Sequence, residues 1–269
     1  MSLIELRNIS KRFGWLVVLN GINLNIEKGQ SLVVIGASGT GKSVLLKHIV
    51  GLLKPDRGEV YFAGRRIDNL SERQLTDVRK RFGFLFQMGA LFDSETVANN
   101  IAFPLVEHTK KSPGEIARLV KEKLAMVGLP DAGSKMPAEL SGGQRKRVAL
   151  ARAIALEPEV ILYDEPTTGL DPVRSDVINE LIIRLQQQLH VTSVVVTHDM
   201  NSAFKVGDRI VMLHEGKMII DGTPEQIRAS DNPVVRRFIV GEADERDLAR
   251  LRVPQSQSEG ADVILKDRA

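Results

Sequence analysis

The chain has 269 residues, a formal net charge of +3 and no cysteine. The charge is too weak to indicate nucleic-acid binding, which needs clustered basic residues, and the lack of cysteine excludes disulfides, thiolate nucleophiles and cysteine-based zinc sites. The first 13 residues carry charges throughout, so we expect no secretory signal, and no apolar run is long enough to span a bilayer. A role at a membrane would therefore need other chains to cross it.

Strand-like and helix-like segments alternate along the chain. The segments predicted to be strands are Leu16–Leu19, Ile22–Ile26, Ser31–Ile35, Gly58–Phe62, Val160–Tyr163 and Ser193–Thr197. Those predicted to be helices are a segment that follows Ser43 to about Val50, then Glu72–Arg81, Glu115–Val127 and Val177–Leu189, with residues 88–157 mainly helical as a whole. This alternation predicts an α/β domain with a mainly parallel sheet.

The composition changes after about Gly241. Residues 242–269 contain no aromatic side chain and include a polar run from Pro254 to Gly260. We therefore predict a catalytic domain of residues 1–240 and a C-terminal extension of residues 241–269. Within the extension, Val263–Leu265 is an apolar tripeptide that we hypothesise to bind a neighbouring subunit or its regulator; the alternative is a frayed terminus.

A glycine-rich loop lies between the predicted strand Ser31–Ile35 and the helix that follows it. Its sequence matches the P-loop pattern G-x-x-x-x-G-K-[ST], in the strand–loop–helix context that the pattern requires. Glycines let the backbone fold closely around phosphates, and the backbone amides at a helix N-terminus attract negative charge. The residues predicted to bind ATP here are Gly36, Ala37, Ser38, Gly39, Thr40, Gly41, Lys42 and Ser43, with Ser43 also a predicted Mg²⁺ ligand.

Two carboxylates end the apolar strand that begins at Val160. In P-loop proteins an aspartate in this place helps to hold Mg²⁺, so we expect Asp164 to lie on the metal side. A neighbouring carboxylate can polarise the attacking water, which makes Glu165 the candidate general base. His198 follows the next predicted strand at the same sheet edge, where it is placed to contact the γ-phosphate. The alternative for a single histidine is a structural role.

The run Leu140–Gln144, with the sequence LSGGQ, is a second anion-binding element. It has two glycines and a serine at the start of a helix, so the same physics applies to it as to the P-loop. A chain with one P-loop and one further phosphate-binding loop suggests that two chains share each nucleotide.

With these motifs, residues 1–240 resemble the ABC transporter ATPase family. The resemblance implies a P-loop ABC-type ATPase core with an N-terminal antiparallel β subdomain and an inserted helical subdomain at about residues 88–157. It implies ATP and Mg²⁺ as cofactors, and a head-to-tail homodimer that encloses two ATP molecules. The residues it implies in contact with the partner's nucleotide are Ser141, Gly142, Gly143, Gln144 and Asp171.

The same resemblance assigns roles to two further residues. Phe13 corresponds to the aromatic that stacks on adenine, with Trp15 as a rival and a place in the core as the alternative for Phe13. Gln87 corresponds to the glutamine that senses Mg²⁺ and the attacking water, and is thus a candidate both for catalysis and for the metal.

Soluble ABC-type ATPases that act on DNA or ribosomes are a second class. DNA-repair members insert long coiled coils or zinc-binding cysteines between the motifs, and ribosome-binding members carry two cassettes; neither feature occurs here. A GTPase or small-molecule kinase would leave the LSGGQ run unexplained. We therefore expect a transporter subunit without a nucleic-acid partner.

The segment from Gln87 to Pro104 is where such ATPases touch their permease. Met88, Leu91 and Phe92 form an apolar cluster that either docks a short permease helix or packs within the helical subdomain. The sequence of Gly89–Pro104 resembles that of the MlaF group. This resemblance implies phospholipid transport between inner and outer membranes, with the chain at the cytoplasmic face of the inner membrane. The partners implied are a permease like MlaE, an MCE-type protein like MlaD and a STAS-domain protein like MlaB. An ABC transporter for another substrate is the alternative.

Overall fold

The computed structural model describes residues 2–243. Contacts divide the chain into two compact units, Met1–Ala229 and Ser230–Ala269. The predicted boundary after residue 240 remains a prediction, and the hypothesis about Val263–Leu265 lies outside the described residues. Over residues 2–243, no helix combines the length and the apolar character that crossing a membrane requires.

An antiparallel sheet is formed by the N-terminal part of the chain. Its strands are β1 (Ser2–Phe13), β2 (Leu16–Glu27), β4 (Arg57–Phe62) and β5 (Arg65–Arg66), in the order β2-β1-β4-β5. The two short strands predicted between residues 16 and 26 are in fact one strand. Gly21 does not end this strand. Gly21 at φ +70° and Asn8 at φ +53° accommodate shifts in the β1–β2 register, so the pairing continues past them. A hydrogen bond of 2.9 Å from the backbone amide of Asn8 to Asn23 Oδ1 joins the two strands there.

A six-stranded sheet forms the centre of the first unit. Its strands are β3 (Ser31–Ile35), β6 (Phe82–Leu85), β7 (Val160–Asp164), β8 (Thr192–Thr197), β9 (Arg209–His214) and β10 (Lys217–Gly222), in the order β10-β9-β3-β8-β7-β6. All neighbours are parallel except β9 and β10. Every residue of β3, β7 and β8 is buried, as expected for central parallel strands that carry apolar runs. The predicted mainly parallel α/β fold is confirmed.

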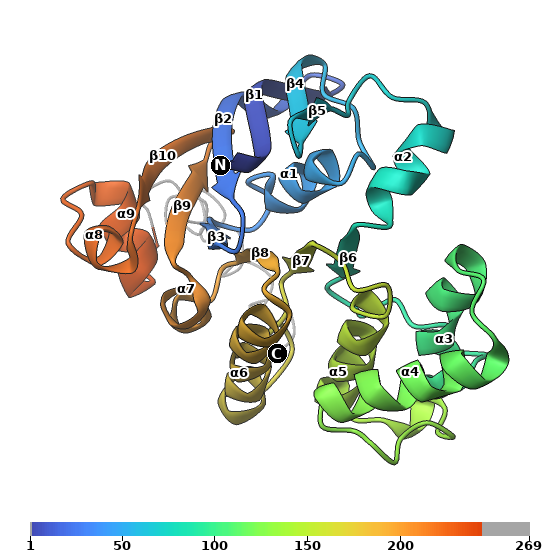
Figure 1. Ribbon diagram of the computed structural model, residues 1–269. Coiled ribbons are helices and arrows are strands. Elements are labelled where there is room, and N and C mark those ends of the chain that lie inside the picture. The colour runs from blue at the N-terminus through green and yellow to red at the C-terminus, as the bar shows by residue number, and fades with distance from the viewer. Residues whose placement is uncertain (1, 244–269) are drawn as a thin grey trace, which may run out of the picture. The chain divides into compact units, whose positions relative to one another are not determined.

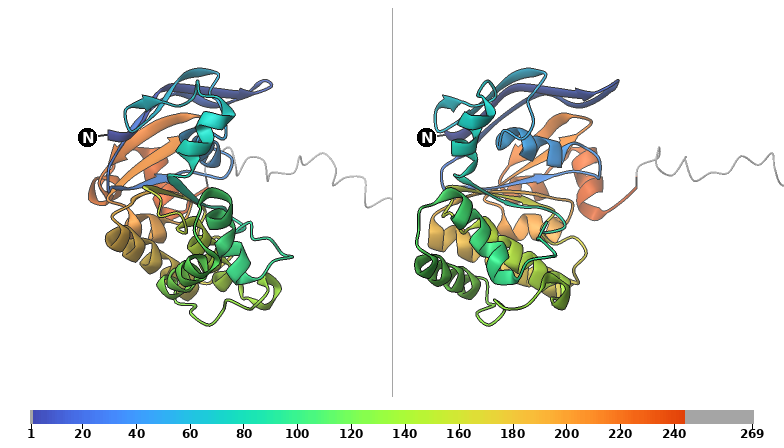
Figure 2. Two further views of the ribbon diagram at one scale, coloured as in Figure 1. Left: turned by 45° about the vertical axis from the view of Figure 1, so that its right-hand side comes forward. Right: turned by 90° about the vertical axis from the view of Figure 1, so that its right-hand side faces the viewer.

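Helix α1 (Lys42–Ile49) lies between the two sheets (Figures 1 and 2). Its buried Leu45, Leu46 and Ile49 share one apolar core with side chains of both sheets. The opposite face of the six-stranded sheet is covered by α6 (Pro172–Leu189) and α7 (Met200–Val206) (Figure 1). The core therefore fixes the loop before α1 against the ends of the central strands.

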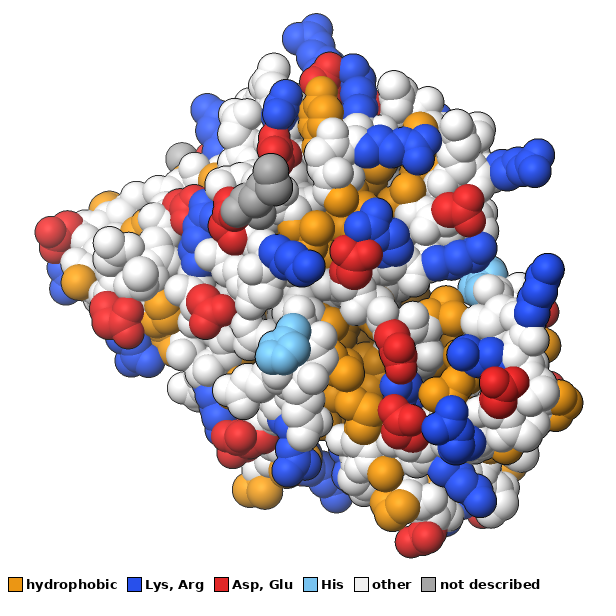
Figure 3. Space-filling view, in the orientation of Figure 1, with side chains coloured by type: hydrophobic (Ala, Val, Ile, Leu, Met, Phe, Trp, Pro, Cys, Tyr) orange, Lys and Arg blue, Asp and Glu red, His pale blue; other side chains and the backbone are white. Residues whose placement is uncertain are grey.

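The middle of the chain is helical, as predicted. After α2 (Glu72–Arg79), which ends two residues before the predicted limit because the chain turns into β6, come α3 (Val97–His108), α4 (Pro113–Met126), a short 3₁₀ helix η1 (Pro137–Glu139) and α5 (Gly142–Ala153). A hollow of about 370 Å³ separates the α4–α5 pair from α6, and Figure 3 shows apolar side chains gathered in it. Helix α8 (Pro224–Arg228) closes the first unit, and α9 (Pro233–Val240), which Asn232 caps, lies in the second.

Candidate active site

The candidate site lies at the carboxyl ends of four neighbouring parallel strands. The register pairs Ile35 of β3 with Thr197 of β8, Val196 of β8 with Asp164 of β7, and Tyr163 of β7 with Leu85 of β6. Parallel strands therefore deliver four groups to one sheet edge, where open α/β sheets bind ligands. These groups are the loop 36–43, His198, the Asp164–Glu165 pair and Gln87.

The loop 36–43 has a backbone that glycine adopts more readily than other residues at three positions, Gly36, Gly39 and Gly41. A Cβ on Gly36 (φ +152°) would lie 2.4 Å from the carbonyl oxygen of Leu213, and Gly41 takes φ +100° where α1 begins. The Lys42 ammonium donates to the carbonyl oxygens of Gly36 at 2.7 Å and Ala37 at 3.0 Å. The Lys42 ammonium thus lies against the loop backbone at the N-terminus of α1, where backbone amides favour a phosphate group.

Ser43 and Asp164 form the adjacent pair. The Ser43 hydroxyl donates to Asp164 Oδ1 over 2.8 Å. Burial raises the pKa of the Asp164 carboxyl, although the Ser43 hydrogen bond opposes that shift, and burial lowers the pKa of Lys42, although the charge of Glu165 opposes it. A hydroxyl and a carboxylate side by side are oxygen ligands of the kind that Mg²⁺ prefers, so these residues fit that ion.

Glu165 is held from three sides. Its carboxylate lies 3.5 Å from Lys42 Nζ and 2.9 Å from His198 Nδ1, and it accepts a hydrogen bond from Thr168 Oγ1 over 3.2 Å. The residue is buried, and its backbone takes the left-handed conformation at φ +50°, which is uncommon for a residue other than glycine. A carboxylate in this position can accept a proton from a water at the γ-phosphate.

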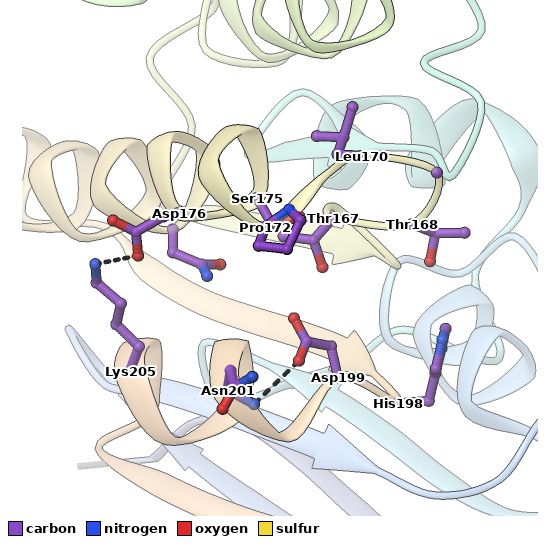
Figure 4. Close-up of a pocket in the computed structure, with 12 residues that line it drawn as sticks. Thr167, Thr168, Leu170, Pro172, Ser175, Asp176, His198, Asp199, Asn201 and Lys205 are labelled. Atoms are coloured by element: carbon purple, nitrogen blue, oxygen red, sulfur yellow. Dashed lines mark hydrogen bonds and ion pairs between the residues drawn. The ribbon is translucent and has the colours of Figure 1, made fainter.

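Thr168 and His198, both of which contact Glu165, line a cavity of about 360 Å³ (Figure 4). Thr167, Thr168 and Leu170, from the turn after β7, lie on one side of it, and His198 and Asp199, from the end of β8, lie on the other. The imidazole of His198 is exposed at this cavity although Nδ1 is engaged with Glu165. The predicted cluster of Lys42, Ser43, Asp164, Glu165 and His198 is therefore brought together.

A second group of predicted residues lies apart from this cluster. The Ser141 hydroxyl caps α5 by accepting from the Gln144 amide over 3.3 Å, and Gln144 Oε1 accepts from the Ser141 amide over 2.9 Å. A side chain on Gly142 or Gly143 would touch Leu170, next to Asp171, which caps α6. Between described residues, no hydrogen bond or ion pair joins Ser141–Gln144 or Asp171 to Lys42, Asp164, Glu165 or His198.

The remaining predicted residues are exposed. Phe13, at the end of β1, has 49% of its surface exposed, so a place in the core does not describe it, and Trp15 is 92% exposed. Gln87 lies two residues beyond β6 and is also exposed. Sequence reasoning did not single out Thr168 or Lys146, a buried lysine of α5 that contacts the backbone of Glu165. The signal for Lys146 is its helical spacing: it lies three and four residues before Ala149 and Leu150, on the buried face of α5.

Comparison with known proteins gives a consistent result. Residues 19–168 match the family described as ABC transporter. MlaF of Haemophilus influenzae, named an intermembrane phospholipid transport system ATP-binding protein, is 45% identical over 90% of this chain and 92% of its own length. A Mycobacterium tuberculosis protein named a probable ribonucleotide transport ATP-binding protein, mkl, is 44% identical over 94% of this chain and 72% of its own length.

One solved structure is similar to this chain in both fold and sequence. It is the dimeric, post-hydrolysis state of the ATP-binding cassette MJ0796 bound to ADP and Pi, with a TM-score of 0.76, 36% identity, and coverage of 82% of this chain and 98% of the cassette. The chain belongs to the ABC transporter ATP-binding family. It binds and hydrolyses ATP, and the expected ABC-type core is confirmed.

Proposed function

We propose that this chain drives phospholipid transport between the inner and outer membranes of a bacterium, as the ATPase subunit of an ABC transporter. The observation that carries the proposal is the similarity to the phospholipid-system protein of H. influenzae over 92% of that protein's length. The relative named for ribonucleotide transport is almost as similar in identity but is longer than the aligned part. The experiment must therefore distinguish phospholipid transport from ribonucleotide transport.

The chemistry follows from the cluster at the sheet edge. The loop 36–43 and Lys42 would bind the phosphates, and Ser43, Asp164 and Gln87 would hold Mg²⁺, which would neutralise phosphate charge. Glu165 accepts a proton from the attacking water. His198 orients the carboxylate through its 2.9 Å contact and contacts the γ-phosphate. Phe13, or its rival Trp15, stacks on the adenine.

Two copies of the chain complete each site. Among the described residues, Ser141–Gln144 and Asp171 make no direct hydrogen bond or ion pair with Lys42, Asp164, Glu165 or His198 of their own chain. In a head-to-tail dimer this group faces the ATP bound by the partner's loop 36–43. The dimeric state of MJ0796 supports this arrangement.

An apolar surface in the helical part is the proposed contact with the permease. Met88 is 88% exposed, and the rings of Phe92 and Phe103 meet edge to face with centroids 4.9 Å apart. The two rings lie at a cavity of about 370 Å³ that Ala102 and Val106 also line on its apolar side and Ser94, Glu95 and Asn99 on its polar side. Such a mixed lining suits one amphipathic helix. A permease like MlaE is the proposed occupant, with proteins like MlaD and MlaB in the complex at the inner membrane's cytoplasmic face.

Purification from membranes in mild detergent tests the function. We expect the chain to co-purify with a membrane permease, and mass spectrometry of the complex to find phospholipid. The Phe92→Asp variant should lose the permease, whereas Val173→Asp, an exposed site on α6, should keep it. A complex that holds no phospholipid and imports ribonucleotides in vesicles would refute the assignment.

A further inference from the structure

Lys146 is a buried lysine whose charge is directed at the backbone of the catalytic turn. It lies in the second turn of α5 and is only 7% exposed. Its ammonium donates to three carbonyl oxygens, those of Glu165 at 3.2 Å, Pro166 at 2.8 Å and Thr168 at 2.8 Å. An ammonium has three N–H donors, so every donor is used on the four residues that begin with Glu165.

This arrangement is expensive for a residue that serves stability alone. Among the ion pairs of the described residues, none includes Lys146. A buried charge without a counter-charge is unfavourable before its hydrogen bonds are counted, and burial lowers the pKa of Lys146 to about 8, with the charge of Glu165 opposing that shift. An apolar side chain would avoid the buried charge but would remove the donor that holds the carbonyl oxygens of Glu165, Pro166 and Thr168.

The three carbonyl oxygens belong to the turn that aims the Glu165 carboxylate. Glu165 has the left-handed conformation at φ +50°, which is unfavourable for a residue with a side chain. Thr168, whose carbonyl oxygen Lys146 also holds, donates its hydroxyl to Glu165 Oε2 over 3.2 Å. The lysine thus fixes both the backbone of the carboxylate and the backbone of its hydroxyl partner.

The same helix begins with the loop Ser141–Gln144. Lys146 therefore ties the turn of Glu165 to the element that carries the predicted contact with the partner's nucleotide. Displacement of the carboxylate by about 1 Å from its productive position is enough to lower a rate by roughly 100-fold.

We propose that Lys146 is a positioning residue for ATP hydrolysis, which holds the left-handed turn at Glu165 against α5 so that the carboxylate faces the attacking water. The inference rests on the proposed role of Glu165 as the base. It does not depend on what the transporter carries, because ATP hydrolysis alone reports on it.

The test compares substitutions of two buried lysines. Lys146→Gln keeps an amide donor for part of the turn, and Lys146→Met removes every donor. Lys123, which is buried on α4 and paired with Glu122 and Glu157 at 3.1 Å each, is the matched control. We expect kcat to fall roughly 10-fold for Lys146→Gln and roughly 100-fold for Lys146→Met. The Kd of a fluorescent ATP analogue should change less than about threefold, because the loop 36–43 is untouched.

Lys123→Gln and Lys123→Met should change the melting temperature but leave kcat within about twofold of wild type. Two variants at position 146 are included because either one can be too unstable to purify. A folded Lys146 variant with wild-type kcat overturns the inference.

A double-mutant cycle separates positioning from a general structural effect. If Lys146 acts through Glu165, then Lys146→Gln should not slow the residual turnover of Glu165→Gln any further, measured as radiolabelled phosphate released over hours. Multiplied losses in the double variant would show that Lys146 acts by another route and would overturn the inference. Near-normal turnover of Glu165→Gln alone would instead refute the base assignment on which the inference rests.

Discussion

Glu165 is contacted by groups of different chemistry, and their differences suggest what each one does. Lys42 at 3.5 Å is a fixed positive charge, His198 at 2.9 Å is a ring whose orientation follows the end of β8, and Thr168 at 3.2 Å is a neutral donor. The Glu165 carboxylate can accept a proton, as a neutral imidazole of His198 also can, whereas a charged Lys42 and the Thr168 hydroxyl that donates to the carboxylate are not bases here. We therefore keep Glu165, the group that the other three contact, as the proposed base.

The Glu165→Gln variant tests that assignment. The amide keeps the size of the side chain but cannot act as a base, so we expect ATP binding to persist while turnover falls roughly 10²- to 10⁴-fold. Phosphate release by the assembled complex measures the turnover, and a nucleotide-binding assay measures the affinity for ATP. Glu72→Gln, a surface residue paired with Arg79 at 2.8 Å, should leave both unchanged, and a Glu165→Gln enzyme with normal turnover would exclude the role.

Lys146 makes stability depend on pH within a defined window. Its pKa is about 8 in the folded chain and 10.5 in the absence of burial. Below about pH 8 both states carry the proton, and the cost of burying the charge is present in full. Between about pH 8 and 10.5 the unfolded chain binds more protons, so the free energy of unfolding contributed by this group rises with pH.

Denaturant unfolding of wild type and Lys146→Met measures this effect by difference. From about pH 7.5 to about pH 9.5, the stability of wild type relative to the variant should increase by on the order of 1–2 kcal/mol. A relative stability that stays constant or decreases over that range would contradict the lowered pKa.

At the scale of elements, the sequence was informative where a pattern depends on neighbours along the chain. The strand Ser31–Ile35, its glycine loop and α1 were predicted because a fully buried strand needs an apolar run and a phosphate loop needs glycine. The strands β6, β9 and β10 were not. β6 has four residues, and its Gly83 is required by the fold, since a Cβ there would lie 2.5 Å from the carbonyl oxygen of Ala153.

The candidate site shows the same division. The ends of parallel strands could be predicted to meet, so Lys42, Asp164, Glu165 and His198 were expected together. The contacts of Thr168 and Lys146 could not be predicted, because they depend on the left-handed turn at Glu165 and on how α5 packs against it. Pairing of that kind is a property of tertiary structure and leaves no local pattern.

Gly36→Ala tests the fit between the loop 36–43 and the sheet. The added methyl would lie 2.4 Å from the backbone oxygen of Leu213, which cannot rotate away, so the loop must shift. We expect ATP affinity to fall by at least about tenfold. Gly64→Ala is the control, because Gly64 also has a positive φ (+76°) but no atom within 4 Å of the added carbon and lies in the β4–β5 turn. Equal ATP affinities of the two variants would show that the close contact does not matter.

At the scale of the whole molecule, a dimer explains why the predicted site residues fall into two separate groups. Lys42 and Glu165 lie in one group, whereas Ser141 and Asp171 lie in the other. If each nucleotide is enclosed by the first group of one chain and the second group of another, then a defect in Lys42 and a defect in Ser141 damage opposite halves of a site. The two substitutions can therefore be placed in different chains of one dimer.

A mixture of Lys42→Ala and Ser141→Arg chains tests this arrangement. Each variant alone should form only damaged sites and hydrolyse ATP poorly. In a mixed dimer, one site combines the intact Lys42 of one chain with the intact Ser141 of the other, and the second site collects both defects. With random pairing, half the dimers are mixed, so activity should recover to roughly a quarter of wild type if the intact site works independently.

A mixture of Lys42→Ala and Glu165→Gln is the control. Both residues belong to the same group and contact each other at 3.5 Å, so every site in every mixed dimer keeps one defect and no recovery is expected. Recovery in the first mixture and not in the second is the result that a shared site requires. If neither mixture recovers although mixed dimers form and one intact site is enough for hydrolysis, then Ser141 acts on the nucleotide of its own chain, and the head-to-tail arrangement is wrong.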